Sequence, residues 1–483
     1  MSTSLVWFRR DLRLSDNPAL AEAIEVGGTV IPVFVDDSAD GLPWPPGSAS
    51  RWWLHHSLQA LDRSLNARGS RLIIRRGPTA IALQQLIAET GATRILWNRL
   101  YEPAYIARDQ TLKSQLRKEG LDVRSYNSAL LFEPWTVATQ KQEPYRVFTP
   151  FWRSARGIGF PPPKRTPVER LPSVSPTLPS LDVAELGLLP RIAWDAGLKA
   201  TWTPGEDAAT QSLEDFIRQP LASYADDRDR PDCVGTSRLS PHLHFGEIGP
   251  RQIVAALHHA RGRQSSPPAP RHFETFVREI GWREFAYHLL YHFPATTDAP
   301  LDPRFVDFPW ADGDQAETLA RWQRGQTGIP LIDAGMRELW HTGWMHNRVR
   351  MAVASFLTKN LRLPWLAGAR WFWDTLVDAD LASNTLGWQW SAGCGADAAP
   401  YFRVFNPVLQ GQRFDGRGAY VRRWVPELAR LDDKVLHEPW IADRQRLAAA
   451  GIELGRSYPE PIVDLRESRL QALAAYAMMK EKN

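Results

Sequence analysis

Cysteine is almost absent from this chain, with 2 among its 483 residues. Cys233 and Cys394 stand far apart, which excludes a disulfide framework and any CxxC or Cys/His metal motif, so no metal is expected. The N-terminus has no basic-then-apolar leader, and no apolar run is long enough to cross a membrane. We therefore expect a cytoplasmic protein that makes no contact with a membrane.

Several catalytic signatures are missing as well. Neither G-x-G-x-x-G nor G-x-x-x-x-G-K follows the first apolar run, which disfavours a dinucleotide or P-loop site there. No Ser/His/Asp or Cys/His arrangement indicates a nucleophilic enzyme. The net charge of +4 and the pI of about 9.0 permit a polyanionic partner without requiring one.

Tryptophan, by contrast, is abundant, with 21 residues. Some of these must belong to the core, but so many favour an additional role in redox chemistry or in stacking on bases. The length of the chain predicts two domains.

Residues 1–130 alternate short apolar runs with helical patterns such as Ser50–Ala67 and Pro78–Glu89. The runs are Leu5–Phe8, Thr29–Val35, Leu72–Ile74, Arg94–Trp97 and Val123–Tyr126. This alternation predicts an α/β domain with a doubly wound parallel sheet, whose ligands lie beyond the carboxyl ends of the strands. The first such loop, residues 9–17, contains three arginines and two acids.

The rest of the chain changes character twice. Prolines cluster between residues 131 and 200, which predicts a long and mostly irregular interdomain linker. From residue 201 to 483 the patterns are helical, so the second domain is expected to be all-α. Its predicted helices are Glu206–Arg218, Pro250–Ala260, His272–His288, Ile332–Trp340, Asn347–Asn360 and Trp365–Ala379.

The stretch from Asp378 to Trp390 is the most informative part of this domain. Asp380 and Asn384 are four residues apart and would share a helix face, with Asp378 at its edge. Buried acids and amides need partners, which a large ligand rich in N–H and hydroxyl groups would supply. A capped helix end with solvated acids is the alternative.

Three further motifs offer binding chemistry. Hydroxyls in Gly235–Leu243, with Pro241 at a helix start, predict an N-cap that is either purely structural or binds an anion. Glu279–Phe285 offers an acid, an aromatic and a base within two turns, which ion pairs on an amphipathic helix also explain. Trp340–Met351 adds arginines that could neutralise phosphates, and its His346 is interpreted as a hydrogen-bonded structural residue.

Taken together, five motifs resemble the DNA photolyase/cryptochrome family over nearly the whole chain. They are Trp7–Arg13, Thr236–Ser240, Trp282–Glu284, Trp344–Arg348 and Asp378–Asn384. Ser50–Trp53, Ser240–Gly246 and Tyr420–Glu427 are similar to plant cryptochromes and to their sister branch, the bacterial class III photolyases for cyclobutane pyrimidine dimers.

The resemblance implies FAD in the helical domain, with FADH⁻ as the working form. It implies contacts to the phosphates and ribitol from Tyr224, Thr236, Ser237, Arg238, Leu239 and Ser240. It implies contacts around the flavin ring and adenosine from Arg283, Asn347, Arg350, Asp378, Ala379, Asp380 and Asn384. Asp380 would accept from a flavin N–H, and Asn384 would lie beside flavin N5.

The implied activity is light-driven repair of UV-damaged DNA, with Glu279, Trp282 and Asn384 as catalytic residues. Excited FADH⁻ would donate an electron to a flipped-out cyclobutane dimer, whose ring opens before the electron returns. The implied DNA and dimer contacts are Arg228, Glu279, Trp282, Asn347, Arg348, Met351 and Trp390. Asn347 and Met351 replace two histidines of photolyases for (6-4) photoproducts, which favours cyclobutane dimers.

The resemblance also assigns electron transfer and light harvesting. Trp388, Trp365 and Trp310 match the family's tryptophan chain that reduces oxidised FAD, although core packing explains each one alone. An antenna of 5,10-methenyltetrahydrofolate is favoured, and its implied contacts are Trp44, Arg51 and Glu102. A deazaflavin or no antenna remains open, because Ala104 and Tyr105 replace the Asn-Glu pair of some folate-binding members.

One further departure and two alternative functions remain. Asn360 replaces an Asp of several relatives, which predicts the loss of a salt bridge to Arg350. A blue-light receptor cryptochrome without repair activity is disfavoured by Trp282 and Asn384. A light-independent flavoprotein that binds nucleic acid is disfavoured by the Trp388/Trp365 pair. We expect a monomer.

Overall fold

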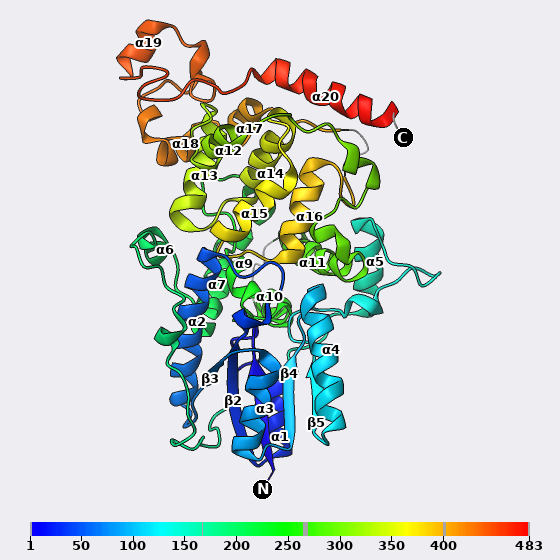
Figure 1. The fold of residues 1–483 in the computed structure, drawn as a ribbon. Helices are drawn as coiled ribbons and strands as arrows, with labels where there is room; N and C mark the ends of the chain where they lie inside the picture. Colours follow the sequence, from blue (N-terminus) through cyan, green and yellow to red (C-terminus); the bar gives the residue numbers. More distant parts are fainter. Residues whose placement is uncertain (1, 167, 264–268, 399–401, 482–483) are drawn as a thin grey trace.

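The N-terminal part of the chain forms a five-stranded sheet in the computed structural model, which describes residues 2–166, 168–263, 269–398 and 402–481. The strands are β1 (Thr3–Phe8), β2 (Thr29–Asp36), β3 (Ile73–Arg76), β4 (Arg94–Asn98) and β5 (Asp122–Tyr126). Their order is β3-β2-β1-β4-β5, and every neighbouring pair is parallel (Figure 1). The predicted doubly wound sheet is confirmed.

Both faces of this sheet are buried, because successive side chains of a strand point to opposite faces. In β1, Leu5 and Trp7 join one core cluster, whereas Val6 and Phe8 join another. The Val6 face is covered by α1 (Pro18–Val26) and α2 (Ser48–Asn66). The Leu5 face is covered by α3 (Thr79–Thr90) and α4 (Pro103–Lys118).

The segment from 131 to 200 is less irregular than the prolines predict. It contains α5 (Phe148–Ile158), whose aromatic side chains are four apart or less and therefore lie on one face. That face packs with α11 (Pro270–His292) in a core cluster of the helical part. The segment also contributes Leu171 and Leu186 to the core of the α/β part, so it is fixed to both parts of the molecule.

The remainder of the chain is helical, and after β5 the described residues contain no further strand of the sheet. The helices that position the site are α8 (Tyr224–Asp227), α9 (Ser240–His244), α13 (Pro330–Thr342), α14 (Asn347–Ser355), α15 (Trp365–Thr375) and α16 (Leu381–Ala392). The others are α6 (Ala196–Thr201), α7 (Glu206–Arg218), α10 (Pro250–Arg263), α12 (Ala316–Gln323), α17 (Pro407–Phe414), α18 (Ala419–Trp424), α19 (Arg444–Ala449) and α20 (Leu465–Glu481).

Two predicted helices are wrong at their carboxyl ends. The first, Asn347–Asn360, is α-helical only to Ser355 and continues as a π-helical turn over Phe356–Asn360. The second, Trp365–Ala379, stops at Thr375, and a short connection with a turn at residues 377–378 then leads to α16. The backbone N–H of Val377 donates to Gly343 O at 2.8 Å, which ties this connection to the end of α13. Asp378 and Asp380 therefore lie between two helices rather than on the face of one.

The α/β and helical parts are joined at the loop that follows β1. Leu12 N donates to Phe245 O at 3.1 Å, and Arg13 Nη1 donates to Gly246 O at 2.8 Å. Gly246 has a φ of +65°, and a Cβ there would lie 2.6 Å from Asp11 Cα, so only glycine fits this close crossing. Arg13 and Asp16 of this loop thus help to hold the two parts together, whereas Arg9 and Arg10 pair with acids of the α/β part.

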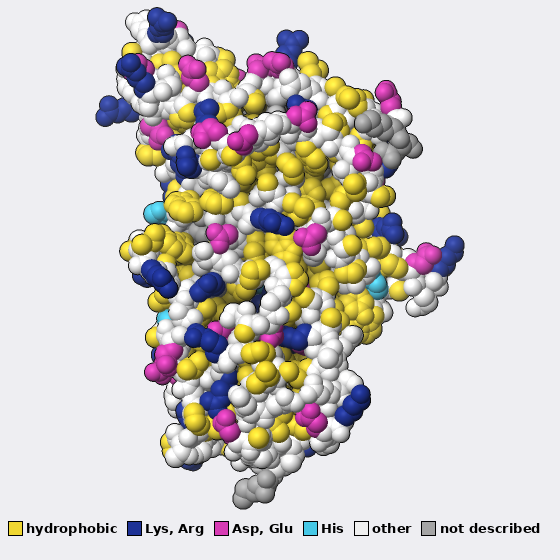
Figure 2. All heavy atoms as spheres, viewed as in Figure 1, with side chains coloured by type: hydrophobic (Ala, Val, Ile, Leu, Met, Phe, Trp, Pro, Cys, Tyr) yellow, Lys and Arg dark blue, Asp and Glu magenta, His cyan; other side chains and the backbone are white. Residues whose placement is uncertain are grey.

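The face of the molecule shown in Figure 2 is apolar over its middle, around α15 and α16. Acidic and basic side chains are interspersed on this face and form no patch of one sign. Within the described ranges, no helix is long and apolar enough to cross a membrane. No group of three or more His, Cys, Asp or Glu side chains in those ranges could hold a metal ion.

Candidate functional site

Two buried acids meet in the connection between α15 and α16. Asp378 accepts from Arg350 Nη2 at 3.1 and 2.9 Å, and Arg350 Nε donates to Met345 O at 2.7 Å. Asp380 is the N-cap of α16, where its Oδ1 accepts from Ser383 N at 2.8 Å. Both acids thus have donors that offset the cost of burying a carboxylate.

Asn360 forms no ion pair with Arg350, as the sequence predicts. Its Nδ2 donates to Ser468 Oγ at 2.9 Å, so the side chain is directed toward α20. Arg350 nevertheless has a carboxylate partner, because Asp378 takes that place.

The loop before α9 places hydroxyls and a cation close together. Arg238 has a φ of +51°, and its guanidinium lies over the Trp344 ring at 4.7 Å. Burial lowers the pKa of Arg238, and within the described part of the chain this side chain makes no hydrogen bond or ion pair. The neighbouring Leu239 is buried. A half-buried cation without an anion fits a phosphate group that the chain does not supply.

The predicted N-cap in this loop is wrong in detail. Helix α9 has only five residues, begins at Ser240, and has the backbone of Leu239 at its N-cap without a side-chain hydrogen bond. Ser237 Oγ instead accepts from Leu239 N at 3.4 Å, so it supports the turn. Pro241 is in the first turn, as predicted.

Asn384 and Arg283 approach the acids from α16 and α11. Asn384 Nδ2 donates to Ala369 O at 3.0 Å, which fixes the amide one turn after Asp380. Arg283 Nη1 donates to Ala129 O at 2.7 Å. Carboxylates, an amide, hydroxyls and a free guanidinium form a donor and acceptor set that fits FAD, whose rings carry N–H and acceptor atoms and whose pyrophosphate is anionic.

A second group of residues carries charge at the start of α14 and along α11. Glu279 forms an ion pair with Arg228, and Arg348 forms one with Asp229 at 2.6 Å. His346 Nδ1 accepts from Arg348 N at 3.2 Å and caps α14, and burial lowers the pKa of His346 to about 4. The structural interpretation of this histidine is confirmed.

The two expected aromatic walls have different surroundings. Trp282 stacks on Phe148 of α5 with ring centroids 3.7 Å apart and planes 8° from parallel. Trp390 donates from Nε1 to Asp397 O at 3.1 Å. No ring contact or hydrogen bond between described residues joins Trp282 to Trp390. Asn347 is exposed and Met351 half-buried on α14, so both remain accessible.

The three tryptophans of the predicted electron-transfer chain belong to one core cluster. Trp365 and Trp388 are buried in it, and Trp310 packs against it. The ring neighbours of Trp388 are Phe372 at 4.9 Å and Trp322 at 6.2 Å, whereas that of Trp310 is Phe308 at 4.6 Å. Electron transfer along the chain stays a prediction.

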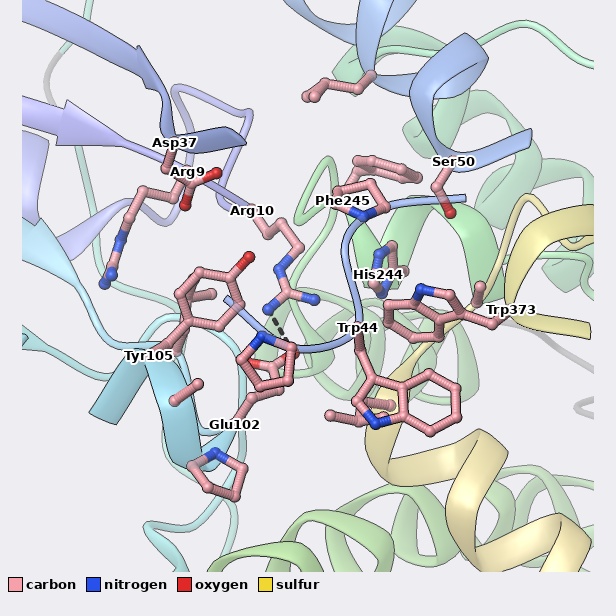
Figure 3. A pocket seen from close by; sticks show the side chains of 18 of the residues that line it. Arg9, Arg10, Asp37, Trp44, Ser50, Glu102, Tyr105, His244, Phe245 and Trp373 are labelled. Atoms are coloured by element: carbon pink, nitrogen blue, oxygen red, sulfur yellow. Dashed lines mark hydrogen bonds and ion pairs between the residues drawn. The ribbon is translucent and has the colours of Figure 1, made fainter. Parts of the chain in front are cut away.

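A pocket of about 1020 Å³, counting space open to solvent, lies where the α/β and helical parts meet. Figure 3 shows Trp44 and Trp373 on one side, and Arg10, Glu102 and Tyr105 on the other. Arg10 and Glu102 form an ion pair, and Trp44 meets Trp373 edge to face at 5.6 Å.

Two of the three predicted antenna contacts line this pocket, and the third does not. Trp44 and Glu102 line it, together with Ser50 at the start of α2. Arg51 does not, because the next residue of a helix is turned by about 100°. Its Nη2 donates to Gly187 O at 2.8 Å. Ala379, a predicted FAD contact, forms part of the same wall.

Four residues that contribute to these sites are not predicted as site residues from the sequence. Phe148 lies in the predicted linker, and its only signal is its aromatic spacing with Trp152. Arg10 belongs to an arginine-rich loop without a distinguishing feature. Tyr287 and His244, which contact Asp380, are separated from it by 93 and 136 positions, so no local pattern could pair them.

Comparison with known proteins adds independent findings. The profile "DNA photolyase" matches residues 4–169, and "FAD binding domain of DNA photolyase" matches residues 276–478. The chain is 49% identical over 478 residues to a deoxyribodipyrimidine photo-lyase of Agrobacterium fabrum, covering 99% of this chain and 98% of that one. It is 40% identical to cryptochrome-1 of Arabidopsis thaliana, covering 99% of this chain and 70% of that one.

A solved structure is equally similar. The crystal structure of a bacterial class III photolyase from Agrobacterium tumefaciens superposes with a TM-score of 0.94 at 48% identity, covering 100% of this chain and 98% of that one. The similarity therefore includes both parts of the molecule.

Proposed function

Because the chain belongs to the DNA photolyase and cryptochrome family, we propose how its own residues carry out the light-driven repair of cyclobutane pyrimidine dimers. The activity is that of a carbon–carbon lyase acting on UV-damaged DNA. The observation that carries the assignment of roles is the charged and aromatic group on α11, where Glu279 and Trp282 lie within one turn of each other.

The lesion is bound by groups that are already paired in the free protein. Arg228 and Arg348 each have an acid partner, Glu279 and Asp229. The phosphates of DNA attract these arginines more strongly than a half-exposed carboxylate does, because the DNA backbone carries closely spaced negative charges. Glu279 is then released from Arg228 and becomes free to accept hydrogen bonds from the flipped dimer.

The aromatic side chains orient the dimer. Trp282 is backed by Phe148, which restrains its ring and leaves the opposite face for stacking, worth about 1–3 kcal/mol per base. Trp390 forms the opposite wall, and Asn347 and Met351 contact the dimer from α14. A dimer extruded from the duplex thus meets a rigid, prearranged surface.

FAD binds in the helical domain. When bound, it would supply the light-driven electron transfer that opens the two bonds between the pyrimidines. Asp380 would accept from a ring N–H and Asn384 would lie beside the ring, with Asp378 held by Arg350. Arg238, Tyr224 and the hydroxyls of Thr236, Ser237 and Ser240 would hold the phosphates. These groups would hold the cofactor in place and stabilise the negative charge of its reduced form in a site shielded from water.

The pocket between the two parts is the antenna site, and 5,10-methenyltetrahydrofolate suits it. Trp44 and Trp373, which meet edge to face, give an aromatic wall, and the Glu102 carboxylate can accept from the amino group of a pterin. Burial raises the pKa of Tyr105 to about 12, so its hydroxyl remains a donor. The Asn-Glu pair of some relatives is replaced here by Ala104 and Tyr105, and Glu102 supplies the acid instead.

The protein acts as a monomer in the bacterial cytoplasm, where its DNA substrate lies. Support for this compartment comes from its bacterial relatives and from Cys233 and Cys394, which are both free thiols. Glu279 and Trp282 belong to the same chain as the predicted FAD contacts, so catalysis needs no second copy.

Single-turnover repair by the photoreduced protein tests these roles. An oligonucleotide with one thymine dimer is illuminated, and dimer loss is followed for wild type, Glu279→Gln and the control Glu274→Gln. Glu274 lies on the same helix but pairs with Arg156 at 3.0 Å on the surface. We expect Glu279→Gln to slow repair about 10- to 100-fold, the effect of losing a hydrogen bond to a charged group. Equal rates in all three proteins would overturn the role of Glu279.

A further inference from the structure

Asp380 is held by three elements that are far apart in the sequence. Its Oδ1 accepts from Ser383 N at 2.8 Å, within α16. Its Oδ2 accepts from the Tyr287 hydroxyl of α11. His244 Nδ1, at the end of α9, lies 3.6 Å from the same oxygen. The contacts of Tyr287 and His244 are buried and that of Ser383 is partly buried, so the orientation of the carboxylate is fixed before any ligand binds.

His244 also lines the antenna pocket. The pocket wall includes His244 together with Ala379 and Leu381, the two neighbours of Asp380 in the sequence. Figure 3 shows the His244 ring inside the pocket, between Phe245 and Trp44. A single layer of side chains therefore separates a ligand in this pocket from Asp380.

The negative charge of the Asp380 carboxylate can interact electrostatically with both the flavin and a ligand in the antenna pocket. Burial pushes the pKa of Asp380 upward, but the His244 ring, Arg283 and the Tyr287 hydroxyl together hold it below its usual range. The carboxylate is thus ionised in an interior of low polarity, where a change of charge nearby is weakly screened. His244 Nδ1 faces Asp380 Oδ2 at 3.6 Å, beyond hydrogen-bond distance, and makes no hydrogen bond to any described residue, so its ring can respond to a ligand in the pocket.

We propose that Tyr287 and His244 are positioning residues that orient the Asp380 carboxylate toward the flavin, and that His244 couples occupancy of the antenna pocket to the redox state of the flavin. The coupling rests on the proposed function, since it takes folate in the pocket and the flavin ring beside Asp380. Reduction of the flavin adds negative charge on one side of Asp380. His244, which lies between Asp380 and the pocket, transmits the resulting change in electrostatic potential to the folate. By linkage, bound folate shifts the flavin potential by the same free energy.

The test titrates the FAD-containing protein with 5,10-methenyltetrahydrofolate in the oxidised and the photoreduced form. We expect the two dissociation constants to differ about fivefold or more, the lower end of typical coupling between sites. In Tyr287→Phe and His244→Leu the ratio falls below about twofold while FAD stays bound. Tyr291→Phe is the matched control: Tyr291 lies one turn later on α11 and contacts Trp135 instead, so it should keep the wild-type ratio.

The flavin midpoint potential gives a second readout that needs no folate. Removal of the Tyr287 hydroxyl leaves the carboxylate charge less shielded, so Tyr287→Phe should lower the potential, whereas Tyr291→Phe should not. A potential in Tyr287→Phe equal to that of wild type would overturn the positioning role. Folate that binds both forms of wild type equally would overturn the coupling, whereas no folate binding to either form would overturn the antenna site itself.

Discussion

Gly368 lies where α15 meets α16, and an alanine there should displace Trp388. A Cβ at position 368 would lie 2.6 Å from Leu357 Cδ2 and closer still to the Trp388 ring. Ordinary contact begins at 3.4 Å, so the Leu357 side must retreat by about 0.8 Å, the difference between these distances, and the indole by more. Both neighbours are buried, so neither can move into solvent.

The net effect follows from two opposing contributions. Alanine gains about 0.8–1.0 kcal/mol over glycine in a helix interior. Overpacking of a tight core costs about 1–3 kcal/mol. We therefore expect Gly368→Ala to lower the free energy of unfolding by about 0–2 kcal/mol. We also expect it to slow photoreduction of oxidised FAD, because the displaced Trp388 belongs to the predicted electron-transfer chain.

Urea unfolding followed by circular dichroism measures the first effect, and bleaching of oxidised flavin under blue light with an external reductant measures the second. The control is Gly157→Ala in α5, where nothing lies within 4 Å of an added Cβ. It should retain only the helical gain. A Gly368→Ala protein that is more stable than wild type and is photoreduced at the wild-type rate would refute the packing argument.

Three further perturbations test other parts of the account. Burial raises the pKa of Glu284 to about 7 from an ordinary 4.5. The folded state therefore binds this proton more tightly than the unfolded state, and the free energy of unfolding falls as pH rises from about 5 to 7. Glu284→Gln should flatten this slope in urea unfolding at a series of pH values, and an unchanged slope would count against the raised pKa. Trp44→Ala should weaken folate binding about tenfold in a fluorescence titration, while Arg51→Ala should leave it unchanged. Phe148→Leu should raise the Kd for dimer-containing DNA about 2- to 10-fold by loosening Trp282, and an unaltered Kd would show that the stack does not matter.

The sequence predicts the architecture well because the strands and helices of this fold follow from the local periodicity of apolar residues. Each predicted strand of the sheet lies within an observed strand or departs from it by a residue or so, and the all-α character of the second domain is correct. The alternation of apolar and helical segments is a strong signal when both sheet faces are buried. Helix α5 was missed because the prolines around it outweighed a single short amphipathic face.

The break between α15 and α16 shows a different limit. An apolar run through Val377 continues the helical pattern, but Asp380 caps a new helix and the connection is bonded to Gly343. A side chain that starts a helix competes with the backbone that would continue one, and the sequence alone does not show which prevails. The two acids therefore lie in a short connection between helices, where carboxylates can face a ligand directly.

The roles of site residues were accessible mainly through resemblance to a family. Local pattern alone leaves Glu279 and Arg283 as ordinary charges on a helix, since their partners Arg228 and Ala129 lie 51 and 154 positions away. Long-range contacts of this kind depend on the whole packing arrangement. The same reason explains why Tyr287 and His244 were not found in advance.

The most direct measurement of the central claim uses wild-type protein, photoreduced and mixed with duplex DNA carrying either one cyclobutane thymine dimer or one (6-4) photoproduct. We expect the cyclobutane dimer to disappear under blue light and to persist in the dark, and the (6-4) lesion to persist in both, because Asn347 and Met351 offer no proton-transfer pair. Persistence of the cyclobutane dimer in the light, with reduced FAD bound, would contradict the repair function and favour a light receptor.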